Sequence, residues 1–250
     1  MNGIEYYECR IGANVLRGMI HRGTNPSPII MVHGYFSSNK IGPHRLYYQI
    51  AQALNQLGYT VLRVDFSGMG ESDGDIKNIH FSNHVSDLLS VIDDVVWRKE
   101  LCSSGKVHLL AHCIGCCTAL TAAHSRMGNV ESITLMSPFY PSEYNHRKML
   151  GEECFLAISK NGSGYRNGAY CCKSFVDAAY ILTEPVMLEL LRMIPANLVI
   201  SECDDFVALE ELITWSDTVP IIGKVIAEAN HNYIGPEVRK RLIEHLLCVF

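Results

Sequence analysis

The chain has 250 residues, of which 48% are hydrophobic, and a formal charge of −5 from 21 Lys and Arg against 26 Asp and Glu. This composition excludes a disordered chain, and the acidic balance gives no electrostatic footprint for nucleic acid. No stretch approaches the roughly 18–20 apolar residues of a membrane helix. The first residues carry no secretory pattern, so we expect the 10 cysteines to be free thiols in a reducing, cytoplasmic location.

Predicted strands and helices alternate along most of the chain. Two β-prone segments around a turn predict an opening strand pair, continuous apolar runs predict strands buried on both faces, and apolar residues at spacings of three and four predict helices. In chain order we expect strands at 5–10, 15–21 and 28–32, a helix at 44–57, a strand at 59–66, a helix at 85–96, a strand at 107–111, a helix at 114–124, strands at 130–136, 197–201 and 220–227, and a helix at 237–247.

This alternation predicts the α/β class, with a doubly wound, mostly parallel sheet that is covered on both faces. Residues 138–194 break the rhythm, because they show no convincing pairing of a strand with a helix. A segment of this length is usually a functional insertion. We therefore expect a core made of residues 1–137 and 195–250, with 138–194 as a cap over one end of the sheet.

The strongest local motif lies where a buried strand runs straight into a helix of small residues, at Cys113. Ala111 stands two residues before it and Gly115 two residues after it, as a tight strand–turn–helix requires. Such a turn lifts one side chain above the carboxyl edge of the sheet. It also places the next backbone N–H, that of Ile114, at the positive end of a helix.

Together with this turn, several motifs in the same order resemble the α/β-hydrolase superfamily over nearly the whole chain. They are His33-Gly34-Tyr35, which looks like the oxyanion loop, the turn-rich residues 65–74, the Cys113 turn, Asp204 after a late strand, and His231 after the last strand. The family usually has Ser at the position of Cys113 and Gly at that of Ala111. A Cys there resembles dienelactone hydrolases and some thioesterase and cyclase domains, and the loops look like the esterase and thioesterase branch with a short lid.

The resemblance implies a hydrolase that cleaves a carboxylic ester or thioester through a covalent acyl-cysteine intermediate. Cys113 would be the nucleophile, His231 the general base and acid, and Asp204 the carboxylate that orients the imidazole. The backbone N–H groups of Tyr35 and Ile114 would bind the oxyanion.

The expected partner is a small-molecule acyl substrate, free or bound to a carrier, with no metal and no cofactor. Tyrosines are frequent in residues 138–194, which favours an aromatic-lined pocket suited to acyl or aryl groups. The candidate substrate contacts are His33, Gly34, His112, Tyr140 and Tyr144.

Several alternatives stay open at this stage. The same three residues would also serve acyl transfer or cyclisation, and a non-catalytic ligand-binding member of the fold would have an inert Cys113. Cys113 and Cys116 form a C-x-x-C pair of the kind used in redox chemistry, and the neighbouring thiols are a weak candidate for zinc. Asp205 and Glu202 compete with Asp204 as the acid.

Overall fold

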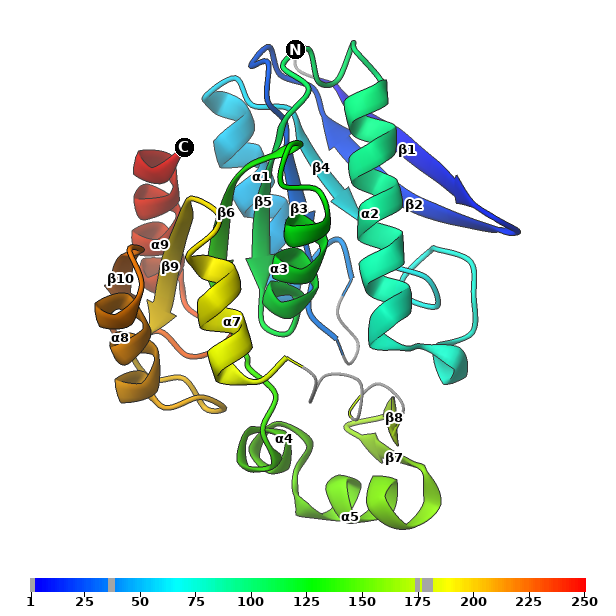
Figure 1. The fold of residues 1–250 in the computed structure, drawn as a ribbon, viewed down its shortest axis with the longest axis vertical. Coiled ribbons are helices and arrows are strands. Elements are labelled where there is room, and N and C mark those ends of the chain that lie inside the picture. Colours follow the sequence, from blue (N-terminus) through cyan, green and yellow to red (C-terminus); the bar gives the residue numbers. More distant parts are fainter. Residues whose placement is uncertain (1–2, 36–38, 174–175, 177–181) are drawn as a thin grey trace.

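The computed structural model describes residues 3–35, 39–173, 176 and 182–250, and its centre is an eight-stranded sheet (Figure 1). The strands are β1 (Ile4–Ile11), β2 (Asn14–His21), β3 (Ile29–Val32), β4 (Val61–Val64), β5 (Val107–His112), β6 (Val130–Met136), β9 (Ala196–Ser201) and β10 (Ile222–Ile226). They lie in the order β1-β2-β4-β3-β5-β6-β9-β10. Only the β1–β2 and β2–β4 pairs are antiparallel, so the predicted fold class is confirmed.

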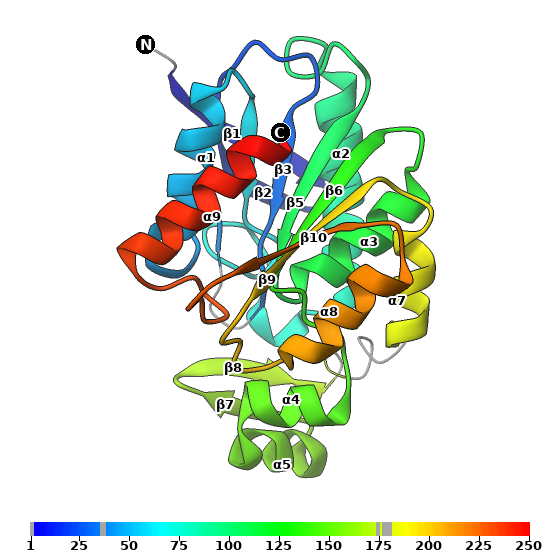
Figure 2. The same ribbon diagram turned by 90° about the vertical axis from the view of Figure 1, so that its left-hand side faces the viewer.

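Helices cover both faces of the sheet (Figures 1 and 2). They are α1 (Leu46–Gln56), α2 (Phe81–Trp97), α3 (Gly115–Ser125), α7 (Glu184–Leu191), α8 (Leu209–Thr218) and α9 (Pro236–Val249). Side chains alternate along each strand: in β3, Ile29 and Met31 pack with α1 and α9, whereas Ile30 and Val32 pack with the helices of the other face, α2, α3, α7 and α8. All four β3 residues are therefore buried, which is why the strand is a continuous apolar run.

A separate group of elements lies beyond the carboxyl ends of the parallel strands (Figures 1 and 2). It consists of α4 (Glu143–Leu150), α5 (Glu152–Asn161) and the antiparallel hairpin of β7 (Ser163–Arg166) and β8 (Ala169–Cys172). We call residues 143–172 the α4–β8 segment. A small hydrophobic cluster is formed by its residues Leu150, Cys154, Phe155, Ile158 and Cys171 together with Val176, which follows the segment. Of the predicted insertion 138–194, α7 packs against α3 instead, and residues 174–175 and 177–181 lie outside the described residues.

The parallel register brings the ends of several strands to one edge of the sheet. Val32 of β3 is paired with Ala111 of β5, Met136 of β6 with Val199 of β9, and β10 ends beside β9. The loops that follow these strands are distant in sequence, yet they meet at this edge. The carboxyl edge of an open α/β sheet is the usual place for a ligand site.

Candidate active site

Cys113 sits in the turn between β5 and α3 with a backbone φ of 59°, in the left-handed region that non-glycine residues rarely adopt. Its N–H donates to the Met136 carbonyl at 3.1 Å, and its carbonyl accepts from the Cys116 N–H at 3.0 Å. Such a conformation costs about 1–3 kcal/mol and persists only where the surroundings enforce it. The strained turn directs the thiol toward a cleft at the sheet edge.

Two glycines let the backbone pass close to this turn. A Cβ on Gly115 would lie 2.5 Å from the His33 carbonyl oxygen and 2.7 Å from that of Val32, which no real side chain tolerates. A Cβ on Gly34 would lie 3.1 Å from the Cβ of Cys113. The loop after β3 therefore runs directly beside Cys113, and it brings Tyr35 to the cleft.

His231, in the loop after β10, is held by Asp204, in the loop after β9. The Nδ1–H of His231 donates to Oδ2 of Asp204 at 2.8 Å. The other carboxylate oxygen accepts from the backbone N–H groups of Phe206 at 2.9 Å and Val207 at 3.2 Å. The Asp204 side chain is 1% exposed, whereas Asp205 is exposed. The structure thus brings Asp204 to the histidine, and not Asp205.

The competing carboxylate Glu202 has a different partner. Its Oε2 accepts from the backbone N–H of Glu228 at 2.7 Å. The Glu202 side chain is exposed at the surface, and this contact holds the turn that follows β10. Glu202 therefore supports the loop that carries His231 without contacting the imidazole.

The surroundings of His231 favour its protonated form. Burial would lower the pKa of this imidazole, but the negative charge of Cys113 and the hydrogen bond to Asp204 outweigh burial and raise it to about 10. The pKa of Asp204 is lowered. Burial would raise it, but the hydrogen bond and the charge of His231 outweigh burial. Nε2 of His231 has no nitrogen or oxygen partner within the described residues, and the group that acts on the imidazole from this side is the Cys113 side chain.

His112 holds the backbone of His231 in place. Its Nε2–H donates to the His231 carbonyl oxygen at 2.8 Å, so its Nδ1 accepts the hydroxyl proton of Tyr47, also at 2.8 Å. Burial, with the charge of His231, lowers the pKa of His112 to about 3. A neutral ring with both nitrogens occupied has none left for substrate, although the ring edge lines the cleft.

The other predicted substrate contacts lie in different environments, and only one of them lines the cleft. His33 is buried, with Nε2 accepting from the Phe66 N–H at 3.1 Å and Nδ1 donating to the Gly34 carbonyl at 2.6 Å, so its ring fixes the loop. Gly34 lines the cleft. Tyr140 instead donates to Glu211 of α8 at 2.6 Å, and Tyr144 is 58% exposed. Neither tyrosine is among the residues that line the cleft.

The cleft has a volume of about 340 Å³. Its described walls come from the sheet-edge loops and from the α4–β8 segment. They are Gly34, Tyr35, Asn39, Gly42, Pro43, His112, Cys113, Met149, Arg166, Asn167, Ala169, Phe206, His231 and Asn232. The sequence reasoning missed Arg166 and Asn167, although Asn167-Gly168 between two short segments is a strong signal for a tight hairpin. Both turn residues have positive φ, 48° and 81°.

Two thiols that follow Cys113 are buried inside the protein. Cys116 donates to the Met136 carbonyl at 3.7 Å and Cys117 to the Phe139 carbonyl at 3.1 Å. Both are fully buried, and burial raises the pKa of each thiol. These contacts disfavour the redox and zinc alternatives, because either thiol would have to leave the core to react.

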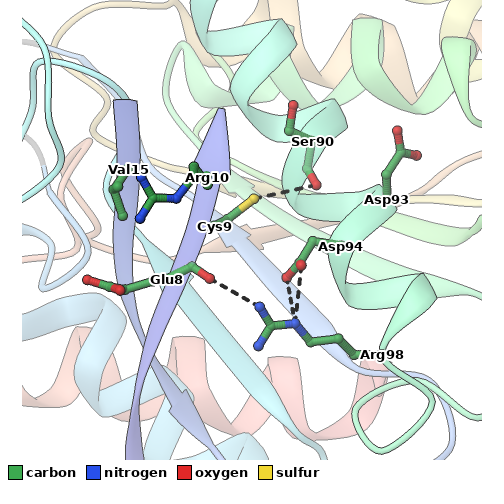
Figure 3. Close-up of a pocket in the computed structure, with 8 residues that line it drawn as sticks. All are labelled: Glu8, Cys9, Arg10, Val15, Ser90, Asp93, Asp94 and Arg98. Atoms are coloured by element: carbon green, nitrogen blue, oxygen red, sulfur yellow. Dashed lines mark hydrogen bonds and ion pairs between the residues drawn. The ribbon is translucent and has the colours of Figure 1, made fainter. Parts of the chain in front are cut away.

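A second hollow lies between β1 and α2 (Figure 3). Three of its charged side chains are paired within the protein: Arg98 with Asp94 at 3.0 Å, and Asp93 with Arg126 at 2.8 Å. The Cys9 thiol there donates to the Ser90 carbonyl at 3.8 Å. None of the predicted site residues lies in this hollow.

Comparisons with known proteins point to one family. A family model described as "alpha/beta hydrolase fold" matches residues 27–190. Palmitoyl-protein thioesterase ABHD10, mitochondrial, of Bos taurus is 36% identical over 80 residues, which are 32% of this chain and 25% of that protein. Triacylglycerol lipase of Pseudomonas fragi is 30% identical over 146 residues, 55% of this chain and 46% of that protein. The match thus spans about a quarter of the first relative and under half of the second.

Solved structures agree on the fold. Est1E from Butyrivibrio proteoclasticus, solved with bound ferulic acid, superimposes with a TM-score of 0.80 at 18% identity, over 96% of this chain and 98% of that one. Among the described residues no helix combines the length and the apolar composition needed to cross a membrane. The bovine relative is named as mitochondrial, and the cytoplasmic location of this chain stays a prediction.

Proposed function

The chain belongs to the α/β-hydrolase family, and from that premise we propose that it cleaves a carboxylic ester or thioester with Cys113 as nucleophile. The observation that carries the proposal is the positive φ of Cys113, 59°, in a turn that lines the cleft beside a histidine bonded to a buried carboxylate. Strain of this kind is retained where function needs it. A merely structural thiol would gain nothing from it.

The proposed chemistry begins with attack by the Cys113 sulfur on the carbonyl carbon, with His231 holding the thiol proton. The resulting oxyanion accepts hydrogen bonds from the backbone N–H groups of Tyr35 and Ile114, a type of contact whose loss costs about 3–4 kcal/mol. Collapse of this intermediate breaks the bond to the leaving group. His231 Nε2–H then donates its proton to the leaving oxygen or sulfur.

The acyl group now forms a thioester with Cys113, and a water molecule completes the reaction. His231 accepts a proton from the water as it attacks, a second oxyanion forms in the same place, and the carboxylic acid leaves with the thiol restored. Asp204 keeps the Nδ1–H in place throughout and stabilises the imidazolium. No step needs a group from outside these loops.

The relatives support an ester or thioester substrate. One is named a palmitoyl-protein thioesterase and another a triacylglycerol lipase. Both names describe cleavage of an acyl bond at its carbonyl carbon. We propose the same class of bond for this chain. A thioester on Cys113 is also reactive toward amines and thiols, so acyl transfer is the second candidate, favoured by the thiol at the nucleophile position.

The sequence predicts a cap in residues 138–194. We propose that the α4–β8 segment, which lies within this range, acts as that cap. Met149, Arg166, Asn167 and Ala169 belong to it and line the cleft opposite the sheet-edge loops. Water is partly excluded by such an arrangement, which strengthens the interaction of the oxyanion with its N–H donors.

Steady-state hydrolysis of 4-nitrophenyl acetate and of a phenyl thioester tests the proposal. We expect Cys113→Ala to abolish turnover, and Cys248→Ala, which removes an exposed thiol at the end of α9, to leave it unchanged. Turnover by Cys113→Ala at the wild-type rate would overturn the proposal. An added amine then separates the two outcomes, since amide product indicates transfer and free acid alone indicates hydrolysis.

A further inference from the structure

Arg166 is the last residue of β7 and precedes the tight turn of the hairpin. Its side chain lines the same cleft as Cys113 and His231. The residue comes from the α4–β8 segment, so it faces the reacting groups from the opposite wall. A charged side chain in this position meets whatever occupies the cleft.

The guanidinium of Arg166 has no carboxylate partner among the described residues. It lies over the ring of Phe206, whose centroid is 5.5 Å from the guanidinium carbon, and its positive charge also acts on the Cys154 thiol. Arg147 of the same segment differs, because it pairs with both Glu143 and Glu152. Stacking on an aromatic face fixes the plane of a guanidinium while its N–H donors stay free.

No acidic side chain in the described lining of the cleft would compete with a bound anion for Arg166. That lining contains no Asp or Glu, and Arg166 is its only permanently charged member. Asp204 lies behind His231 with both oxygens hydrogen-bonded. His112 is held neutral by burial and by its two hydrogen bonds. An anion entering the cleft therefore finds one unpaired cation, in surroundings where charges are less screened than in water.

We propose that Arg166 binds an oxyanion, a carboxylate or a phosphate, that the substrate carries away from its scissile bond. The substrates would then be anionic esters or thioesters. A guanidinium suits this task because its planar fork donates two parallel hydrogen bonds to such a group. The inference rests on the proposed function, since it assigns the substrate class of the same site.

Matched substrates that differ only in charge test the inference. The 4-nitrophenyl esters of glutaric acid and of glutaramic acid carry the group on the acyl side. Acetyl thioesters of 3-mercaptopropionate and of its amide carry it on the leaving group. The quantity to measure is the ratio of kcat/KM for the charged and the neutral member of each pair, in the wild-type chain and in Arg166→Gln, Arg166→Lys and Arg147→Gln.

In at least one pair we expect the wild-type chain to prefer the charged member by about ten- to hundredfold, the range of a hydrogen bond to a charged group. Arg166→Gln should bring that ratio to about 1, Arg166→Lys should keep part of it, and Arg147→Gln, which removes an arginine from the same segment outside the cleft, should keep all of it. The pair that responds tells on which side of the scissile bond the anion lies. Equal ratios in wild type and Arg166→Gln for both pairs would overturn the inference.

Binding measurements separate this inference from the proposed function. If no ester is hydrolysed, the proposed function fails, and calorimetric titration of the folded protein with glutaramate decides the role of Arg166. Saturable binding that Arg166→Gln abolishes and Arg147→Gln retains would support the anion site by itself. Absent or Arg166-independent binding would refute it.

Discussion

At the scale of single residues, the candidate site combines a strained backbone with a buried pair of opposite charges. Cys113 is held at positive φ by two hydrogen bonds, one donated by its N–H and one accepted by its carbonyl oxygen. The His231 side chain is 3% exposed and the Asp204 side chain is 1% exposed. The positive φ of Cys113 costs free energy that packing elsewhere has to offset. The contact between Asp204 and His231 favours the charged form of both groups.

The raised pKa of His231 predicts how stability depends on pH. A group whose pKa is higher in the folded state stabilises the fold fully below its unfolded pKa of about 6.5, and this contribution is lost as pH rises toward the folded value of about 10. Between pH 6.5 and 8 this group should lower the free energy of unfolding by an amount on the order of 1 kcal/mol. Asp204→Asn removes one of the two partners that raise this pKa, the other being Cys113. Stability of the variant should therefore decrease less with pH than that of the wild type, and the other histidines, which are unchanged, cancel in the comparison.

Urea unfolding at a series of pH values measures the effect. The comparison of wild type with Asp204→Asn is made between pH 6.5 and 8, because the thiols and phenols of the unfolded chain titrate at higher pH and also change stability there. Asp204 itself has a lowered pKa, so its own contribution is present in this window and is lost only in acid. Identical pH slopes in the two proteins would contradict the proposed coupling.

At the scale of elements, the β5–α3 junction depends on a glycine that a side chain cannot replace. Helix propensity alone predicts that Gly115→Ala gains about 1 kcal/mol, because Ala is the better helix former. The added Cβ would meet two backbone carbonyl oxygens, of His33 and Val32, at 2.5 and 2.7 Å. We therefore expect a net loss, since such overpacking costs about 1–3 kcal/mol.

Gly128→Ala is the matched control, because a Cβ there meets nothing within 4 Å. Its free energy of unfolding should change by less than about 0.5 kcal/mol. Denaturant titration of both variants checks the expectation. A Gly115→Ala protein as stable as the wild-type chain would show that the loop after β3 does not press against the turn as the structure has it.

Elements with a strong periodic signal were predictable from the sequence. The apolar run of β3 and the strand–helix junction at Cys113 are where they were expected, because residues buried on both faces leave an unambiguous pattern. Helix α8 was missed, although Leu209, Leu212 and Trp215 recur at helical spacing. Its signal is short and is mixed with polar residues that face solvent.

The contacts of the candidate site were predictable where strand order determines them. Asp204 and His231 follow neighbouring parallel strands, so a correct assignment of β9 and β10 brings them together. Arg166 is different, because its position depends on how a separate hairpin docks beyond the sheet. No local pattern encodes that docking, so its place in the cleft could be recognised only from the folded chain.

At the scale of the whole molecule, the described hydrophobic residues fall into three clusters. Two large clusters lie on the two faces of the sheet, and the α4–β8 segment forms a small third one together with Val176. Of its buried residues, the segment contributes only Met149 and Cys172 to the larger clusters. We therefore expect it to open locally, below the free energy of global unfolding. The cleft wall that carries Arg166 belongs to this less stable part.

Two truncations in different clusters test this division. Leu120→Ala, in the large cluster around α3, should lower the free energy of global unfolding by about 2–5 kcal/mol. Ile158→Ala, in the small cluster, should shift the global transition much less, as monitored by the buried Trp215. It should instead speed proteolytic cleavage within residues 143–172. A global loss as large as that of Leu120→Ala would contradict the division.

Whether Cys113 carries the acyl group is tested most directly by intact-protein mass spectrometry after brief mixing with 4-nitrophenyl acetate at neutral pH. We expect one added acetyl group in the wild-type chain, mapped by peptide analysis to Cys113 and lost again by hydrolysis. We expect no such adduct in Cys113→Ala and slower formation in His231→Ala. An adduct that maps to another residue, or hydrolysis that proceeds with Cys113 replaced, would contradict the proposed role of Cys113.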